Sequence, residues 1–168
     1  MREANPPVWP AVPPRAWLAA LSIGCFGAVA IGMILQHLLQ LSPCPLCIFQ
    51  RFLYLAVGVV AGLGALLPAL RLAVGGLSGA LGVLGLGVAA YQSWMQAYPD
   101  LAPTCSFSDP NIIERFVYWL GAEFPDWFLA TGLCSSVDWQ LFGLSMANWS
   151  IFFFAGIALF AGLVVRRG

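Results

Sequence analysis

The sequence predicts an all-α integral membrane protein: a four-transmembrane-helix bundle with a long outer loop that carries a short interfacial helix. One observation is composition, because 61% of the 168 residues are hydrophobic, only 8% are charged, and the mean hydropathy is +0.87. All seven basic residues other than the histidine are arginines, too few for the charged shell of a soluble domain. The other observation is four long uncharged stretches. At this length we expect a single membrane domain over residues 1–168.

Each uncharged stretch can hold one transmembrane helix. The stretches contain 21 residues after Arg15, 19 after Arg51, 28 after Arg71 and 27 before Arg166. About 20 residues suffice to cross roughly 30 Å of hydrocarbon at about 1.5 Å per residue. We therefore expect helices at about 16–38, 46–67, 72–97 and 148–165.

The arginines predict the orientation of the bundle. An even number of spans puts both termini on one side, and most of the arginines belong to that side: Arg2, Arg15, Arg71, Arg166 and Arg167. The positive-inside rule then places both termini in the cytoplasm and the segments 39–45 and 98–147 outside. The net charge is zero and no basic block exists, so nothing indicates nucleic-acid binding.

The outer loop 98–147 holds six of the seven acidic residues and is predicted to contain a short helix. Asp109 fits as its N-cap, with Pro110 at the first helical position. Its apolar face is expected to comprise Ile112, Ile113, Phe116, Val117 and Leu120, with Glu114 and Arg115 off that face. Such a helix either lies in the membrane interface or covers the bundle as an ordinary loop helix.

Small residues predict how the membrane helices pack. Gly58 and Gly62 are one helical turn apart, and the third helix carries a stripe of small residues on one face: Gly75, Ser78, Gly82, Gly85 and Ala89. Lipid gives helices no hydrophobic drive to associate, so close backbone approach at small residues holds such bundles together. The stripe predicts a central, tightly packed third helix.

Four of the five cysteines fall on the outer side, where an oxidising compartment permits disulfides: Cys44, Cys47, Cys105 and Cys134. The C-x-x-C pair Cys44 and Cys47 can form a small strained ring that is redox-labile. Cys105 and Cys134 share one loop and can bridge across it, which leaves a purely structural disulfide open for them. A c-type haem site needs His where Ile48 stands, and a four-thiolate zinc site usually has two C-x-x-C knuckles, so we expect no metal.

Arg51 follows Cys47 by four residues and Cys44 by seven, so the three share one helix face. An arginine inside a membrane span is costly unless it has a partner, which makes it a functional candidate. Its guanidinium can favour a thiolate on Cys47 and can donate hydrogen bonds to a carbonyl oxygen. The alternative is an arginine that extends to the interface.

Two further polar residues stand at the outer ends of membrane helices. His37, seven residues before Cys44, is either a polar cap or part of the site. Gln92, with Trp94 and Gln96, either faces a ring-shaped ligand or belongs to the interfacial aromatic belt.

Several short motifs are spread over about 16–165: Gln36-His37, Pro43-Cys44-Pro45-Leu46-Cys47-Ile48 with Arg51, Tyr98-Pro99, Pro103-Thr104-Cys105-Ser106-Phe107, Gly132-Leu133-Cys134, and Phe142-Gly143-Leu144-Ser145-Met146 with Trp149. Taken together, these motifs resemble the DsbB family of disulfide bond formation proteins in bacterial inner membranes.

The resemblance implies an enzyme that reoxidises a soluble periplasmic DsbA-like thioredoxin-fold oxidase and reduces a quinone of the membrane pool, either ubiquinone or menaquinone. It implies that the partner attacks Cys105 and that Cys134 then exchanges with Cys44. It also implies that Cys47 meets the quinone as a thiolate beside Arg51. The expected resting disulfides are Cys44–Cys47 and Cys105–Cys134.

The remaining cysteine, Cys25, is expected to be a free thiol because it alone lies in the membrane interior. His37 and Gln92 join Cys47 and Arg51 as candidate quinone-binding residues. Family members often carry a histidine where Gln92 stands, and glutamine can donate a hydrogen bond to a carbonyl but cannot carry a proton at neutral pH.

Two other functions stay open at this point. One is a related membrane oxidoreductase dedicated to a single client, as in the DsbI-like branch. The other is a non-catalytic membrane scaffold whose outer loop is held by disulfides. A scaffold has no need of Arg51 on the cysteine face or of a labile C-x-x-C pair, so the enzyme is favoured.

Overall fold

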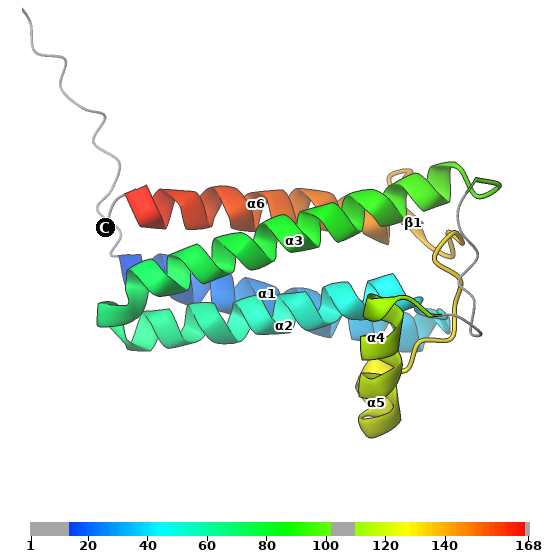
Figure 1. The fold of residues 1–168 in the computed structure, drawn as a ribbon, viewed down its shortest axis with the longest axis horizontal. Coiled ribbons are helices and arrows are strands. Elements are labelled where there is room, and N and C mark those ends of the chain that lie inside the picture. Colours follow the sequence, from blue (N-terminus) through cyan, green and yellow to red (C-terminus); the bar gives the residue numbers. More distant parts are fainter. Residues whose placement is uncertain (1–13, 102–109, 167–168) are drawn as a thin grey trace, which may run out of the picture.

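Four long helices packed side by side form the body of the protein (Figure 1). The computed structural model describes residues 14–101 and 110–166. The long helices are α1 (Pro14–Leu39), α2 (Pro45–Leu66), α3 (Arg71–Ala97) and α6 (Met146–Arg166). Each is long and apolar enough to cross a membrane, so the predicted four-helix bundle is confirmed.

The helix boundaries lie within two residues of the predicted ones. The helix α6 begins earlier than expected because the Ser145 hydroxyl accepts a hydrogen bond from the Asn148 backbone N–H at 3.3 Å, which caps the helix directly after Ser145. A short 3-10 turn, η1 (Pro68–Leu70), joins α2 to α3 at the end of the bundle where α1 begins and α6 ends.

The small residues lie where the long helices approach one another. All five members of the stripe on α3 are buried, and α3 packs most extensively against α6. A Cβ added at Gly85 would collide with the ring of Phe154 on α6, and one at Gly58 would press on Cys25 and Phe26 of α1. The predicted close packing at these positions is confirmed.

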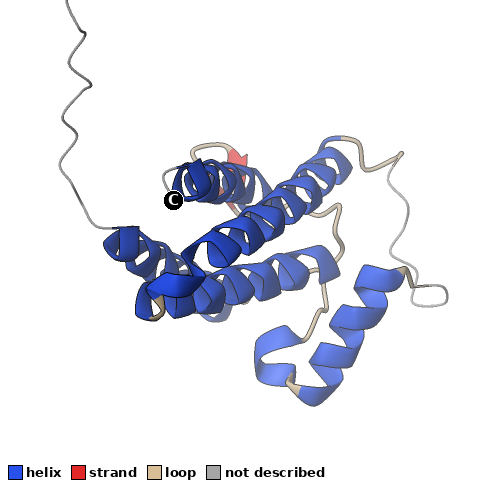
Figure 2. Cartoon of the chain, turned by 60° about the vertical axis from the view of Figure 1, so that its left-hand side comes forward, coloured by secondary structure: helices blue, strands red, loops and turns tan. Residues whose placement is uncertain are grey.

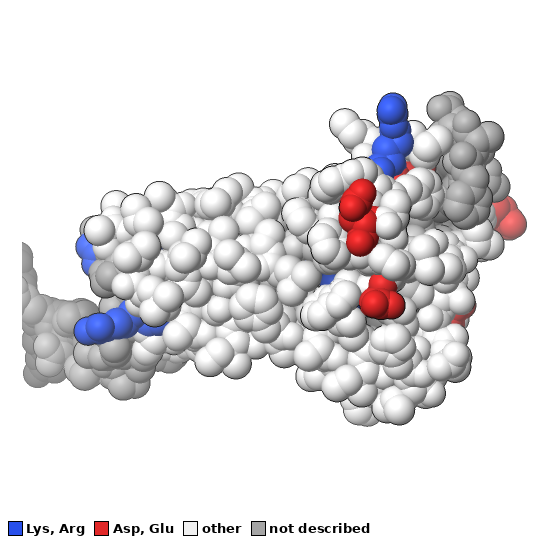
Figure 3. All heavy atoms as spheres, turned by 90° about the horizontal axis from the view of Figure 1, so that it is seen from below, with Lys and Arg blue, Asp and Glu red and all other residues white. Residues whose placement is uncertain are grey.

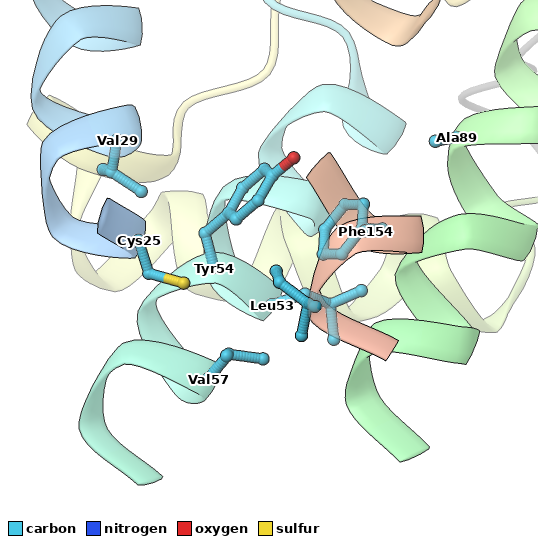
Figure 4. Close-up of a cluster of buried hydrophobic side chains, with 8 residues drawn as sticks. Cys25, Val29, Leu53, Tyr54, Val57, Ala89 and Phe154 are labelled. Carbon is cyan, nitrogen blue, oxygen red and sulfur yellow. The ribbon is translucent and has the colours of Figure 1, made fainter. Parts of the chain in front are cut away.

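A cluster of buried side chains fills the middle of the bundle (Figure 4). Tyr54 of α2 stacks on Phe154 of α6, with ring centroids 4.3 Å apart and an interplanar angle of 14°. Cys25 of α1 belongs to this cluster. By contrast, large apolar side chains such as Ile23, Val83 and Leu159 are exposed on the outside of the bundle, which suits contact with lipid.

The outer segment holds two short helices, α4 (Ile112–Glu123) and α5 (Pro125–Phe128), which run across the bundle axis near one end (Figures 1 and 2). They attach to α2 through Phe116, whose ring lies edge-on to Phe52 with centroids 5.1 Å apart.

The start and the buried face of α4 differ from the prediction. Asn111 is the N-cap and forms a capping box with Glu114, so Pro110 precedes the helix, and Asp109 lies outside the described residues. Because Glu114 folds back to bond the Asn111 N–H, its side chain is buried, whereas Ile112 is 84% exposed. Burial on α4 therefore does not follow the predicted apolar face at Glu114 and Ile112.

The sequence analysis did not predict a hairpin before α6, made of strands β1 (Gln140–Leu141) and β2 (Leu144–Ser145). Its two-residue turn places Phe142 at φ 54° and Gly143 at φ 77°. Two consecutive positive φ values are what a tight hairpin turn of this twist requires. The strands are too short, and Phe-Gly is too uncommon a turn sequence, for the pattern to be recognised beforehand.

Candidate functional site

The C-x-x-C sequence forms the first turn of α2. Cys44 is the N-cap residue and Pro45 the first helical residue, and the Cys44 sulfur accepts a hydrogen bond from the Cys47 N–H at 3.4 Å. The Cys44 thiol donates to the Cys47 sulfur at 3.2 Å, too long for a disulfide. The structure describes this pair as two neighbouring thiols, and the disulfide expected for the resting protein stays a prediction.

Gln92 of α3 is the polar side chain that meets both sulfurs. It is 2% exposed, and its amide nitrogen donates to Cys47 Sγ at 2.9 Å and to Cys44 Sγ at 3.3 Å. Its amide oxygen accepts a hydrogen bond from Gln50 Nε2 at 2.7 Å. Two buried amides thus form a short chain that ends on the cysteine pair.

Cys134 is brought to the same place by the loop after α5. Pro43, just before the C-x-x-C pair, accepts backbone hydrogen bonds from Thr131 at 2.9 Å and Gly132 at 3.0 Å. Cys134 is 1% exposed and packs with Cys44 in one buried cluster. Cys105 lies outside the described residues, so its pairing with Cys134 stays a prediction.

The Cys44 thiol is the protonated member of this group. Its hydrogen bonds with Cys134 and then Cys47, together with burial, raise the pKa of Cys44 well above its ordinary value. A thiol with a raised pKa keeps its proton and donates it in a hydrogen bond, as Cys44 does toward Cys47. The two sulfurs of the C-x-x-C pair are therefore not equivalent.

Arg51 lies close by but is held by other groups. Its guanidinium donates to the Trp127 backbone carbonyl at 2.6 Å and to Gln36 Oε1 at 2.6 Å. These bonds tie α2 to the segment that follows α4 and to α1. They also supply the partners that an arginine inside a membrane span needs.

A cavity of about 620 Å³ opens beside the cysteine pair and extends into the bundle. Its polar lining includes Cys44, Cys47, Arg51 and Gln92. Its apolar lining comes mainly from α1 and α6 and includes Ile31, Leu35, Trp149 and Phe153. A large, mostly apolar cavity with a few polar groups at one end is typical of a small-molecule site.

Of the predicted site residues that the structure describes, His37 lies apart from the others. It is exposed and lines a second, almost wholly apolar hollow together with Trp127 and residues of α1. It does not line the cavity beside the cysteines.

Gln50 was not predicted from the sequence, and Gln36 was named only within a matching motif and not as a site residue; the two side chains contact Gln92 and Arg51 respectively. Gln50 directly precedes Arg51, and a buried amide in a membrane helix is itself a signal that could have singled it out.

The chain is similar to known proteins over most of its length. The family described as Disulfide bond formation protein DsbB matches residues 14–164. A Disulfide bond formation protein B from Dechloromonas aromatica (strain RCB) is 64% identical over 93% of this chain and 94% of its own length. Similarly named proteins from Polaromonas sp. (strain JS666 / ATCC BAA-500) and Azoarcus sp. (strain BH72) are 40% and 41% identical, over 92% and 88% of this chain and 92% and 89% of theirs.

Proposed function

The chain belongs to the DsbB family of membrane disulfide bond formation proteins, and from this premise we propose that it reoxidises a soluble periplasmic dithiol protein similar to DsbA and passes the electrons to a quinone. The disulfide-generating oxidoreductase is the family's activity. The partner, the quinone, and a location in the bacterial inner membrane with cytoplasmic termini are the finer parts of the proposal.

The observation that supports this proposal most directly is the convergence of three cysteines at one end of the cavity. Cys134 packs against Cys44, and the Cys44 thiol donates a hydrogen bond to the Cys47 sulfur. Cys44 and Cys47 both line the cavity. An electron pair entering at the outer loop can therefore reach the cavity wall by thiol–disulfide exchange alone.

In the proposed sequence, a partner thiolate attacks Cys105 of a Cys105–Cys134 disulfide, which forms a mixed disulfide and releases Cys134 as a thiolate. Cys134 then attacks Cys44, the Cys44–Cys47 bond breaks, and the electron pair leaves on Cys47. The partner's second thiol displaces Cys105, and Cys105 in turn displaces Cys44 from Cys134. The net result is an oxidised partner and a reduced Cys44–Cys47 pair.

The cavity lining fits a quinone. The guanidinium of Arg51 can donate to a ring carbonyl, and the apolar walls from α1 and α6 suit a ring and its prenyl chain. When bound, a quinone supplies the acceptor for two electrons and two protons. Arg51 and Gln92 place positive charge and N–H donors where Cys47 must carry negative charge before its oxidation.

The test is turnover by the protein purified in mild detergent, with any co-extracted quinone identified by mass spectrometry. We expect one quinone reduced for each partner dithiol oxidised. Cys47→Ser should abolish quinone reduction, whereas the matched control Cys25→Ala, in the bundle core, should keep near wild-type turnover. Partner oxidation without any quinone reduction would contradict the proposal.

The order of exchange is tested by trapping. Cys134→Ser removes the thiol that resolves the partner's mixed disulfide, so an adduct on Cys105 should accumulate. An adduct on Cys44 with Cys105 unmodified would show that electrons enter elsewhere.

A further inference from the structure

Gln50 is a buried amide on α2 for which the electron-transfer scheme above has no use. Its side chain is 4% exposed, within a helix that spans the membrane. Burying an amide there is unfavourable unless its polar atoms are hydrogen-bonded. The bond that it makes leads to Gln92, 42 positions further along the chain on α3.

The contact between the two amides determines which end of Gln92 faces the cysteines. Gln50 Nε2 donates to Gln92 Oε1 at 2.7 Å, so the amide oxygen of Gln92 is turned away from the sulfurs. Its NH₂ group consequently points at Cys47 Sγ, at 2.9 Å, and at Cys44 Sγ, at 3.3 Å. Were Gln92 to rotate by half a turn, a carbonyl oxygen would face the sulfurs and repel a thiolate.

We propose that Gln50 is a positioning residue: by donating a hydrogen bond to the Gln92 amide oxygen, it holds the Gln92 N–H donors on the Cys44–Cys47 pair and so stabilises the thiolate on Cys47. When Cys134 attacks Cys44, the breaking Cys44–Cys47 bond leaves its electron pair on Cys47. An N–H donor already aimed at that sulfur stabilises the leaving thiolate without reorganisation. This inference rests on the proposed role of Cys44 and Cys47 as the redox pair.

The other groups near Cys47 act independently of this amide chain. Arg51 follows on the same helix, but its guanidinium bonds Gln36 and the Trp127 carbonyl. Cys44 donates its thiol proton to Cys47. Removing Gln50 therefore alters one of several stabilising groups, and the expected effect is moderate.

The test is the rate at which a small maleimide alkylates Cys47 in the fully reduced protein at pH 7, followed by peptide mass spectrometry. Alkylation requires the thiolate. Losing the aligned donor should lower the thiolate fraction about tenfold. A more basic thiolate is also more nucleophilic, which raises the alkylation rate of each thiolate about threefold and offsets part of this loss. Gln50→Met should therefore slow alkylation of Cys47 about threefold.

A double-mutant cycle separates positioning from a general structural role. Gln92→Met should slow the reaction at least as much as Gln50→Met, and the double variant should be no slower than Gln92→Met alone. An unchanged rate in Gln50→Met, or equal slowing by Gln50→Met in both backgrounds, would overturn the proposal.

Alkylation of Cys25 in the same samples serves as the internal control, because this thiol is buried in the core and reacts faster only if the bundle loosens. Should Gln50→Met expose Cys25, Gln50→Asn, whose amide is too short to reach Gln92, takes its place in the same cycle. Neither quinone nor partner is added to the assay, and alkylation does not depend on either. A wild-type protein without quinone reductase activity would refute the proposed function and leave this comparison intact.

Discussion

At the scale of single residues, Arg51 joins the cavity to the outer segment. Its two hydrogen bonds reach Gln36 on α1 and the backbone of Trp127 in α5, while the residue itself lines the cavity beside Cys47. An arginine that merely extends toward water would not need two short hydrogen bonds to two different helices. The planar guanidinium can address several groups at fixed angles, which an ammonium cannot.

Arg51→Lys should therefore raise the apparent KM for quinone substantially while leaving thiol exchange with the soluble partner nearly unchanged. Loss of one charge-assisted hydrogen bond of about 1.5–3 kcal/mol corresponds to roughly a 10- to 150-fold effect. Arg51→Gln should be worse, because the charge near Cys47 is lost as well. The measurement is quinone-reduction kinetics on purified variants.

The matched control is Arg115→Lys, at an exposed position on α4, which should keep wild-type kinetics. If quinone dependence is unaltered in both Arg51 variants, Arg51 does not belong to the quinone site.

The sequence allowed some of these residues to be predicted and not others. Cys44, Cys47 and Arg51 share a face by helical spacing alone, and all three line one cavity. The Gln50–Gln92 contact depends on how α2 and α3 are rotated against each other, which no spacing within one helix determines. The position of His37 near the outer end of α1 was predictable from the sequence. The sequence did not show that its side chain lines a second hollow and not the cavity beside the cysteines.

At the scale of elements, the loop after α5 must approach the start of α2 very closely for Cys134 to meet Cys44. Gly132 makes this possible. A Cβ at this position would collide with the backbone carbonyl of Ser42, and carbonyl oxygens of the peptide chain cannot move aside as side chains can. The two hydrogen bonds from Thr131 and Gly132 to Pro43 then hold the loop in place.

Gly132→Ala should slow exchange between Cys134 and Cys44 about 10- to 100-fold, since a displacement of about 1 Å between reacting atoms can cost about a hundredfold. Attack of the partner on Cys105 should change little. Acid-quenched thiol labelling, with the Cys44–Cys134 disulfide followed in time, measures the step directly.

For comparison, Gly76→Ala adds a methyl group at an exposed position of α3 that has nothing within 4 Å, and should behave as wild type. Equal exchange rates in the two glycine variants would show that the close approach at Gly132 is unimportant.

Long elements were predictable because the hydrocarbon thickness sets both their length and their lack of charge, so all four membrane helices were expected. Short elements were not. The helix α4 begins at Ile112 because Asn111 and Glu114 cap each other, an interaction that competed with Asp109-Pro110 as a start signal. The β1–β2 hairpin rests on two-residue strands, which carry no periodicity to detect.

At the scale of the whole molecule, charge is distributed along the bundle axis. On the face shown in Figure 3, acidic side chains gather at the end that carries α4 and α5, where basic side chains also lie, whereas the charged side chains seen at the opposite end are basic and the surface between the two ends is almost uncharged. Arg15, Arg71 and Arg166 stand at or near helix ends on the side opposite the cysteines. This is the distribution that the positive-inside rule associates with a cytoplasmic face.

A reporter fused after Gly168 should therefore report the cytoplasm: green fluorescent protein should fluoresce there, and alkaline phosphatase, which needs disulfides to fold, should be inactive. Asp126→Cys, exposed on α5, should in turn be labelled from the periplasm by a membrane-impermeant maleimide. Disulfides persist only where the compartment is oxidising, so the proposed exchange requires Cys44, Cys47 and Cys134 to lie at the periplasmic end. An active phosphatase fusion at Gly168 would place the cysteines at the cytoplasmic face, where glutathione and thioredoxin keep thiols reduced, and would contradict both the orientation and the proposed partner.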